Sequence, residues 1–160
     1  MENTYRELNA KLCAFLDRTP NSFFAVKNIK EELVAHGFAE LQENSRWQLQ
    51  EGGKYYVSRN GSALLAFVIP KKAYLGFQVY ACHCDSPAFK LKNNAEIVVD
   101  ERYVKLNVEM YGGMLLNTWL DRPLSVAGRV LCNVDGRLEA RLVNIEQDLL
   151  LIPNLAIHMN

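Results

Sequence analysis

The sequence predicts an α/β fold in which two helices come first and strands follow. Apolar residues recur at helical spacing between Tyr5 and Val34, and the pattern then changes to the shorter period of strands. Helices followed by several strands are typical of a layered domain in which the helices cover a sheet. The length of 160 residues agrees with one ordinary domain.

The composition excludes several classes of protein. The chain is 49% hydrophobic and 22% charged, so it can fold around a core. Its formal net charge is zero and no basic stripe stands out, so we expect no nucleic-acid partner. The N-terminus lacks the apolar core of a signal peptide, and no segment approaches the roughly 18 apolar residues of a membrane span. We therefore expect a cytoplasmic protein with reduced cysteines and no membrane partner.

Two helices are predicted at the N-terminal end. The first has an apolar face made of Tyr5, Leu8, Leu12, Phe15 and Leu16. The second has its own apolar face, made of Phe23, Val26, Ile29, Leu33 and Val34. Ser22 can cap the start of this second helix, and Gly37 stands where a left-handed residue ends it. His36 is then expected to be a structural residue in the last turn, near the negative end of the helix dipole.

The remainder of the chain has the pattern of strands. Asn60-Gly61 and Asp135-Gly136 are each flanked by apolar runs and predict two hairpins with two-residue turns. We also expect a strand over residues 74–85 and further strands over residues 96–113. We expect a polar turn at Asn93-Asn94, where the pattern of helices followed by strands changes to a strand-rich pattern. It suggests a boundary between residues 1–92 and residues 93–160.

The stretch LLLIPNLAIHMN, residues 149–160, is an apolar run with no closing polar element. Such a run needs a partner that buries it. It therefore indicates either a fragment of a longer protein or an obligate oligomer.

The stretch VYACHCDSPAFKLK, residues 79–92, concentrates the chemically active side chains. Because side chains alternate across a strand, His83 and Asp85 should share one face, and Cys82 and Cys84 the other. A histidine can bind a metal through one ring nitrogen while a nearby carboxylate orients the ring. The pair also fits a core histidine that is satisfied by its neighbour. The thiols could contribute to a zinc site or, as we expect, pack as small buried hydrophobes.

The sequence around this stretch resembles a known family. HCDSPAFKLK, residues 83–92, is similar to the His-x-Asp-Ser-Pro segment of the M18 metalloaminopeptidases, the aspartyl aminopeptidase family. Five further segments resemble the same family in the same order: FLDRTPNSFFAVKNI, GFAELQENSRW, GGKYYVSRNGSALLAF, YGGMLLNTWLDRPLSVAGRV and IPNLAIHMN. Together they extend over essentially the whole chain, but they match only about the first third of the family's sequence.

The resemblance implies a fold and a set of site residues. Residues 1–92 would be the N-terminal part of a zinc-peptidase α/β sandwich, and residues 93–160 the start of an inserted β-rich dimerisation domain. His83 would be a metal ligand, and Asp85 the carboxylate that supports it in catalysis. His158 would contact substrate in the active site of a neighbouring subunit. Cys84 departs from the small polar residues that are usual at its position.

The resemblance also implies cofactors and partners. The family uses two zinc ions per active site to remove N-terminal residues, often acidic ones, from peptides. It assembles as homo-oligomers built from dimers, typically a dodecamer. The remaining metal ligands and the general base belong to family segments that this chain lacks, so we expect the 160 residues alone to bind zinc incompletely and to be inactive. The alternative is a non-catalytic module that assembles through its β-rich half.

Three distinctive residues of the resembling segments have a structural interpretation. We expect Trp119 to be an anchor, and Asp121 and Arg122 to form an ion pair or a cap. Trp and Arg are favoured at interfaces, so subunit contacts are a further expectation for this group.

Overall fold

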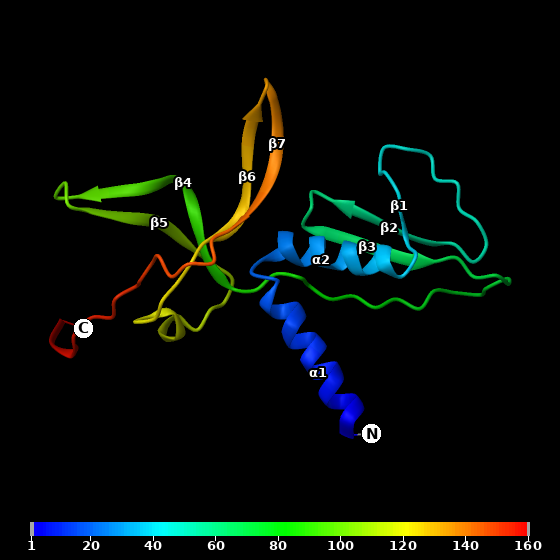
Figure 1. Ribbon diagram of the computed structural model, residues 1–160, viewed down its shortest axis with the longest axis horizontal. Helices are drawn as coiled ribbons and strands as arrows, with labels where there is room; N and C mark the ends of the chain where they lie inside the picture. Colours follow the sequence, from blue (N-terminus) through cyan, green and yellow to red (C-terminus); the bar gives the residue numbers. More distant parts are fainter. Residues whose placement is uncertain (1, 160) are drawn as a thin grey trace. The chain divides into compact units, whose positions relative to one another are not determined.

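The computed structural model describes residues 2–159, and these form two compact units. The first unit combines the described residues up to Asp85 with Val126–Asn144, and the second combines Ser86–Ser125 with the described residues from Ile145 onward. The two α-helices lie in the first unit, and small sheets lie in both (Figure 1). The α/β class is therefore confirmed. The division into catalytic and dimerisation domains at residues 92 and 93 stays a prediction.

Both predicted helices are present, as α1 (Glu2–Asp17) and α2 (Ser22–Ala35). The cap of α2 is Asn21 and not Ser22, because the Asn21 side-chain oxygen accepts from the backbone N–H groups of Phe23 and Phe24, at 3.0 and 3.3 Å. Gly37 ends α2 with φ of 80°. Its N–H donates to Val34 and that of Phe38 to Leu33, which is the Schellman arrangement.

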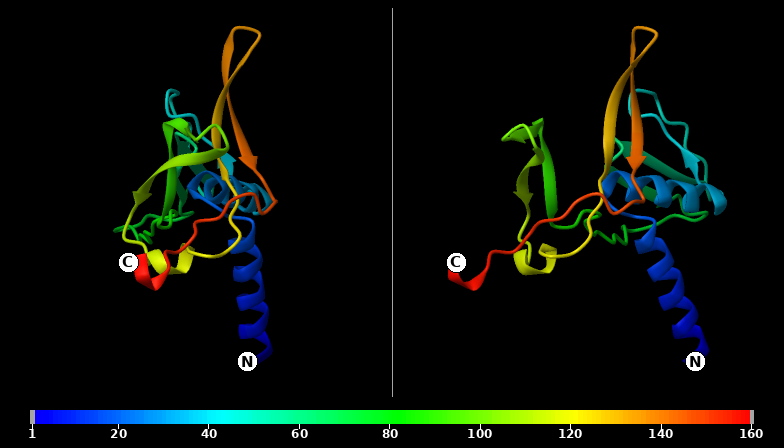
Figure 2. Two further views of the ribbon diagram at one scale, coloured as in Figure 1. Left: turned by 90° about the vertical axis from the view of Figure 1, so that its left-hand side faces the viewer. Right: turned by 60° about the vertical axis from the view of Figure 1, so that its left-hand side comes forward.

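The two helices differ in what they cover. Helix α2 lies along the sheet of the first unit, whereas α1 extends away from that sheet in every view (Figures 1 and 2). The apolar residues of α1 are consequently exposed, by 54% to 65% for Tyr5, Leu8, Leu12 and Leu16. The expectation that both helices cover the strands is therefore wrong for α1 within the described chain.

The sheet of the first unit has the order β1–β2–β3, with β1 (Ala39–Glu40), β2 (Lys54–Arg59) and β3 (Ala63–Val68). Strands β2 and β3 are antiparallel, and Asn60 and Gly61 take positive φ in their turn, which both residues tolerate. The predicted hairpin is confirmed, but Arg59 pairs with Ala63. The connection therefore has three residues instead of two.

The core between α2 and this sheet is small. Ala25, Val26 and Tyr56 are the buried apolar residues among the described ones, and each is at most 3% exposed. Asn28 is buried beside them, where its side-chain N–H₂ donates to the Arg18 carbonyl at 2.8 Å and to the Thr19 hydroxyl oxygen at 3.1 Å. These two bonds tie the middle of α2 to the two residues that directly follow α1.

The first unit also contains a long hairpin of β6 (Ala127–Val134) and β7 (Arg137–Asn144). Val134 pairs with Arg137, so the turn has two residues, Asp135 and Gly136, both with positive φ. The Asn133 side-chain oxygen accepts from the Gly136 N–H at 2.9 Å and supports this turn. The second predicted hairpin is thus confirmed with its predicted turn.

The second unit is built on the antiparallel pair β4 (Ala88–Val99) and β5 (Tyr103–Tyr111). Asn93 and Asn94 lie inside β4, where the register shifts between Leu91 and Glu96. The polar turn that the sequence suggested there is therefore wrong. The two asparagines belong to a bulge, which accommodates extra polar residues without ending the strand.

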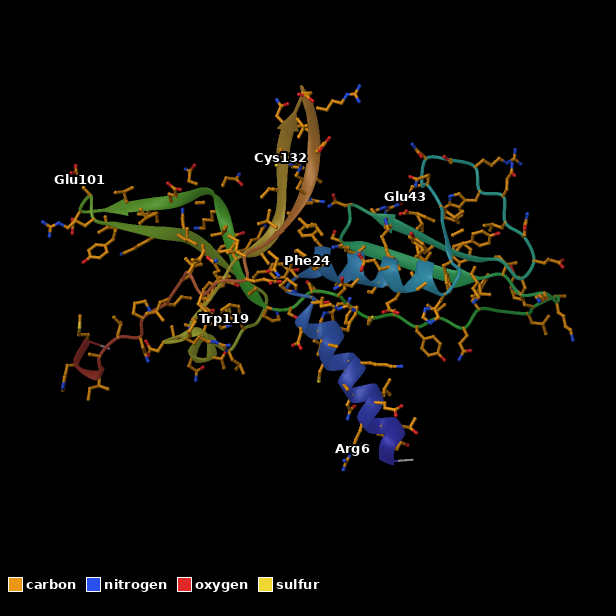
Figure 3. The ribbon with its side chains drawn as sticks, in the orientation of Figure 1. Arg6, Phe24, Glu43, Glu101, Trp119 and Cys132 are labelled. Carbon is orange, nitrogen blue, oxygen red and sulfur yellow. The ribbon has the colours of Figure 1, made fainter. Side chains whose placement is uncertain are left out.

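The short helices η1 (Leu116–Trp119) and η2 (Ile157–Met159) complete the second unit. Trp119, labelled in Figure 3, packs edge-to-face on Phe89 with ring centroids 5.4 Å apart, which agrees with the expected anchor. The Asp121 carboxylate accepts from the Asn154 N–H at 2.9 Å, and Arg122 donates to the Thr118 carbonyl at 3.4 Å. Asp121 therefore ties the apolar run near the end of the chain to the loop that follows η1.

Residues 73–87 are extended but form no strand, so the strand predicted over 74–85 is wrong for the described chain. A strand needs a neighbour for its backbone N–H and C=O groups, and none of the described strands pairs with this segment. Its apolar side chains are exposed on both faces, namely Tyr74, Leu75, Phe77, Val79 and Tyr80. Such a pattern is typical of a strand that is covered on both faces.

None of the helices that the structure describes has the length and apolar character needed to cross a membrane.

Glu40 joins α2 to the sheet and makes the stability of the first unit depend on pH. Lys30 donates to Glu40 Oε1 at 2.6 Å, and the Ser58 and Tyr56 hydroxyls donate to the same carboxylate. Lys30 holds the pKa of Glu40 below its usual value of 4.5, whereas burial and Glu40 raise that of Tyr56. Because the folded pKa of Glu40 is the lower one, its stabilisation is present above pH 4.5 and is lost as the pH falls through the folded pKa.

We expect Glu40→Gln to lower the free energy of unfolding at pH 7 by about 0.5 kcal/mol, since the ion pair is one-third exposed and screened by water. The variant should also lose less stability than the wild type when the pH falls below 4.5. Thermal melts between pH 3 and pH 7 measure both effects. Glu51→Gln, at an exposed turn position, is the control, and an equal loss in that variant would contradict the prediction.

Candidate functional site

The segment that carries the predicted metal ligand brings His83 and Asp85 together. His83 Nδ1 lies 3.0 Å from the Asp85 backbone oxygen and 3.1 Å from its Oδ1. The His83 side chain is 83% exposed and that of Asp85 is 40% exposed. The pair is therefore formed locally, between residues two positions apart, and its ring is open to a ligand.

These contacts determine which ring nitrogen remains for a metal. The Asp85 carbonyl can only accept a hydrogen bond, so Nδ1 must carry the proton when the contact is made. In the neutral ring Nε2 then has the free electron pair, which is the form that binds a metal. A carboxylate at Nδ1 also holds the plane of the ring. The geometry therefore suits a ligand that binds through Nε2.

Two contacts agree with the predicted alternation, His83 with Asp85 and Cys84 with Ser62, although the segment is not a strand. The Cys84 thiol donates to the Ser62 carbonyl at 3.4 Å, away from the His83–Asp85 contact. Cys84 is half-buried and Cys82 is exposed, so the expectation of buried thiols is wrong for Cys82. Sequence reasoning missed Ser62, because its contribution is a backbone carbonyl that no side-chain pattern can reveal.

The described residues do not complete a metal centre. Among the described side chains, those of residues 4–159, no three from His, Cys, Asp or Glu gather closely enough to hold an ion. A catalytic zinc usually has three protein ligands, and the contact between His83 and Asp85 has the geometry of one ligand with its supporting carboxylate. The pair thus fits one corner of a zinc site. A zinc site made by the thiols finds no support in the same residues.

His158 lies in the second unit, within η2. Its side chain is exposed, and the short helix is closed by the Met159 N–H, which donates to the Ala156 carbonyl at 2.8 Å. Neighbouring apolar residues are exposed as well, with Ile157 at 84% and Met159 at 72%. His83 belongs to the other unit, and the contact of His158 with substrate stays a prediction.

Comparison with known proteins gives the class of this chain. The family model described as aminopeptidase I zinc metalloprotease (M18) matches residues 15–160. The chain therefore belongs to the M18 family of zinc metalloproteases, as the resembling segments predicted.

Particular relatives agree with this assignment. A probable M18 family aminopeptidase 2 from Clostridium acetobutylicum is 48% identical over 158 residues, which are 96% of this chain and 36% of the relative. The cryo-EM structure of the Ape4 and Nbr1 complex contains a chain with 39% identity and a TM-score of 0.92, covering 98% of this chain and 31% of that one. The mApe1 dodecamer of S. cerevisiae is 30% identical with a TM-score of 0.82, over 97% of this chain and 37% of its own.

This chain thus spans slightly more than a third of the length of the curated relative from Clostridium acetobutylicum. The shares of the solved structures are similar, at 31% and 37%. A single candidate ligand, His83, agrees with this proportion, because further ligands can come from the two-thirds of such proteins that have no counterpart here.

The contact between Asp85 and His83 predicts a tautomer. We expect neutral His83 to carry its proton on Nδ1, and Asp85→Ala to shift the ring toward the Nε2–H form by about fivefold, the equivalent of one hydrogen bond of about 1 kcal/mol. Long-range ¹H–¹⁵N NMR measures the ratio. His36 is an internal control, since its Nδ1 lies 2.7 Å from the Glu32 carbonyl and should not respond. A wild-type His83 in the Nε2–H form would contradict the assignment.

Proposed function

We propose that the protein carrying this chain is a zinc-dependent aminopeptidase that hydrolyses N-terminal residues from peptides, and that the chain corresponds to its N-terminal part. The match of the M18 family model over residues 15–160 is the observation that carries the proposal. The His83–Asp85 contact supports it, because the geometry is that of a metal-binding histidine with an orienting carboxylate.

In this proposal each residue has a defined task. His83 binds one zinc ion through Nε2, and Asp85 holds the protonated Nδ1 so that the ring keeps its orientation. Two zinc ions, held in part by His83, would supply Lewis-acid chemistry that polarises the scissile carbonyl and makes water a better nucleophile. The general base and the remaining ligands come from segments outside these 160 residues. The chain alone therefore binds zinc incompletely and is inactive.

His158 is proposed to contact the substrate in the active site of a neighbouring subunit. Its exposure in η2, beside the exposed Ile157 and Met159, supports a position at a subunit surface. Self-association into dimers, and into a dodecamer for the whole protein, is part of the same proposal. The dodecameric structure of the relative mApe1 supports this self-association. We also propose the cytoplasm as the compartment of the protein.

Removal of His83 tests the metal assignment. In the whole protein we expect His83→Ala to lower the bound zinc and to reduce kcat/KM for an aminoacyl amide at least 100-fold, because a ligand is lost. Asp85→Ala should cost 10- to 100-fold, as is usual for a residue that supports a ligand. Elemental analysis and initial rates measure these effects. His36→Ala, which removes a helix-end histidine, is the matched control, and equal losses in that variant would refute the assignment.

The separated chain tests the missing ligands. We expect residues 1–160, purified free of whole protein, to show no zinc-dependent hydrolysis of aspartyl or leucyl amides. The whole protein should hydrolyse at least one of them, and the ratio of the two rates measures any acidic preference. In the whole protein, His158→Ala should raise KM or lower kcat without a loss of zinc. Zinc-dependent turnover by the short chain would disprove the role of absent segments.

A second candidate function is a non-catalytic module that assembles through its β-rich half. The observation that favours it is the exposure of large apolar side chains along β4–β7, namely Val98, Tyr103, Val104, Met110, Leu131 and Leu138. Such surfaces mark association sites. Two measurements together distinguish the proposals: sedimentation of the short chain and the activity assay of the whole protein. A defined oligomer of the short chain, together with no turnover by the whole protein, supports the module.

A further inference from the structure

The turn between β2 and β3, residues 60–62, contacts two distant segments of the first unit. On one side, Arg129 of β6 donates from Nη1 to the Asn60 carbonyl at 2.6 Å and to Asn60 Oδ1 at 3.1 Å. On the other side, the Ser62 carbonyl accepts from the Cys84 thiol at 3.4 Å. The three-residue turn therefore connects the Arg129 contact to Cys84, the residue that directly follows His83.

Arg129 is held firmly enough to act as an anchor. Its guanidinium lies 4.3 Å from the centroid of the Phe23 ring, at the start of α2, in a cation–π arrangement. The charged donor makes stronger hydrogen bonds than a neutral one would. The residue is half-buried, although long cationic side chains are usually exposed. Arg129 thus joins β6, α2 and the turn at one point.

The turn has a backbone that depends on such support. Asn60 and Gly61 have φ of 53° and 66°, and Asn tolerates the left-handed region at a cost that Gly does not have. The Arg129 contacts use both the carbonyl and the side chain of Asn60, so they favour this conformation over others. The Ser62 carbonyl that follows receives its direction from the same turn.

Cys84 connects the β2–β3 turn to His83, the proposed metal ligand. It stands between His83 and Asp85, and its contact with Ser62 directs the thiol away from the His83–Asp85 pair. Segment 73–87 has no strand partner among the described residues, and the Cys84–Ser62 hydrogen bond connects it to the β2–β3 turn. A displaced turn would release Cys84 and loosen the orientation of the imidazole.

We infer that Arg129 is a positioning residue for the metal ligand His83, acting through the β2–β3 turn and Cys84. The inference rests on the proposed function, in which His83 binds zinc, and it adds a residue of β6 to the machinery of the site. Arg129 touches neither metal nor substrate. Its effect is to keep the segment that carries His83 and Asp85 in the orientation that a metal requires.

The test uses the whole protein in a Cys82→Ser background, so that Cys84 is labelled without interference from its exposed neighbour. We expect Arg129→Ala to weaken zinc binding about 10-fold, the loss typical of a group that supports a ligand. The rate at which iodoacetamide labels Cys84 should rise severalfold, measured by mass spectrometry in the zinc-free protein. Arg129→Lys keeps the charge over Phe23 but not the planar fork, and its effects should be intermediate.

Arg141→Ala is the matched control, because Arg141 lies on the same hairpin and pairs with Glu139 on its own strand. It should change neither zinc affinity nor labelling. If Arg129→Ala does not fold, Asn60→Gly replaces it, since this variant keeps the left-handed backbone and removes only the Oδ1 contact; the same shifts are expected in smaller size.

Zinc affinity and labelling of Cys84 that stay within twofold of wild type in the folded Arg129 or Asn60 variants would overturn the inference. If His83→Ala retains zinc and activity, the proposed function fails instead. In that case the labelling of Cys84 still decides whether Arg129 controls the position of this segment.

Discussion

The packing of α2 on the β1–β2–β3 sheet is the contact on which the first unit depends. Ala25 and Val26 of the helix and Tyr56 of β2 are the apolar side chains that the described residues bury almost completely. The Glu40 cluster and Asn28 add directed hydrogen bonds around this small core. Because so little apolar surface is buried, polar contacts carry an unusual share of the specificity of the fold.

The same shortage explains the surface of the chain. One apolar face of α1, both faces of segment 73–87 and the residues near the C-terminal end are exposed. Isolated domains rarely leave so many large apolar side chains uncovered. The relative from Clostridium acetobutylicum is almost three times as long, and the solved structure of S. cerevisiae mApe1 is a dodecamer. Additional segments and neighbouring subunits are the natural partners of these faces in the proposed aminopeptidase.

The site was predictable where its geometry is local. His83 and Asp85 stand two residues apart, so an extended backbone brings them to one side whether or not a strand forms. The predicted strand was wrong because strand formation depends on hydrogen-bonding neighbours, which a single segment cannot specify. Arg129 was not found, because a separation of 69 residues from Asn60 leaves no spacing that a reader of the sequence can recognise.

The sequence by itself determined the two helices, the two glycine-containing hairpins, the family and the pairing of His83 with Asp85. Each of these depends on local periodicity, on a backbone preference or on a recurring motif. The tertiary structure decided that α2 covers the sheet while α1 does not, that Asn93 and Asn94 form a bulge, and that the β6–β7 hairpin joins the first unit. These outcomes depend on contacts between segments that are distant in the sequence. The free energies of such contacts come from three-dimensional packing, which local sequence patterns do not reveal.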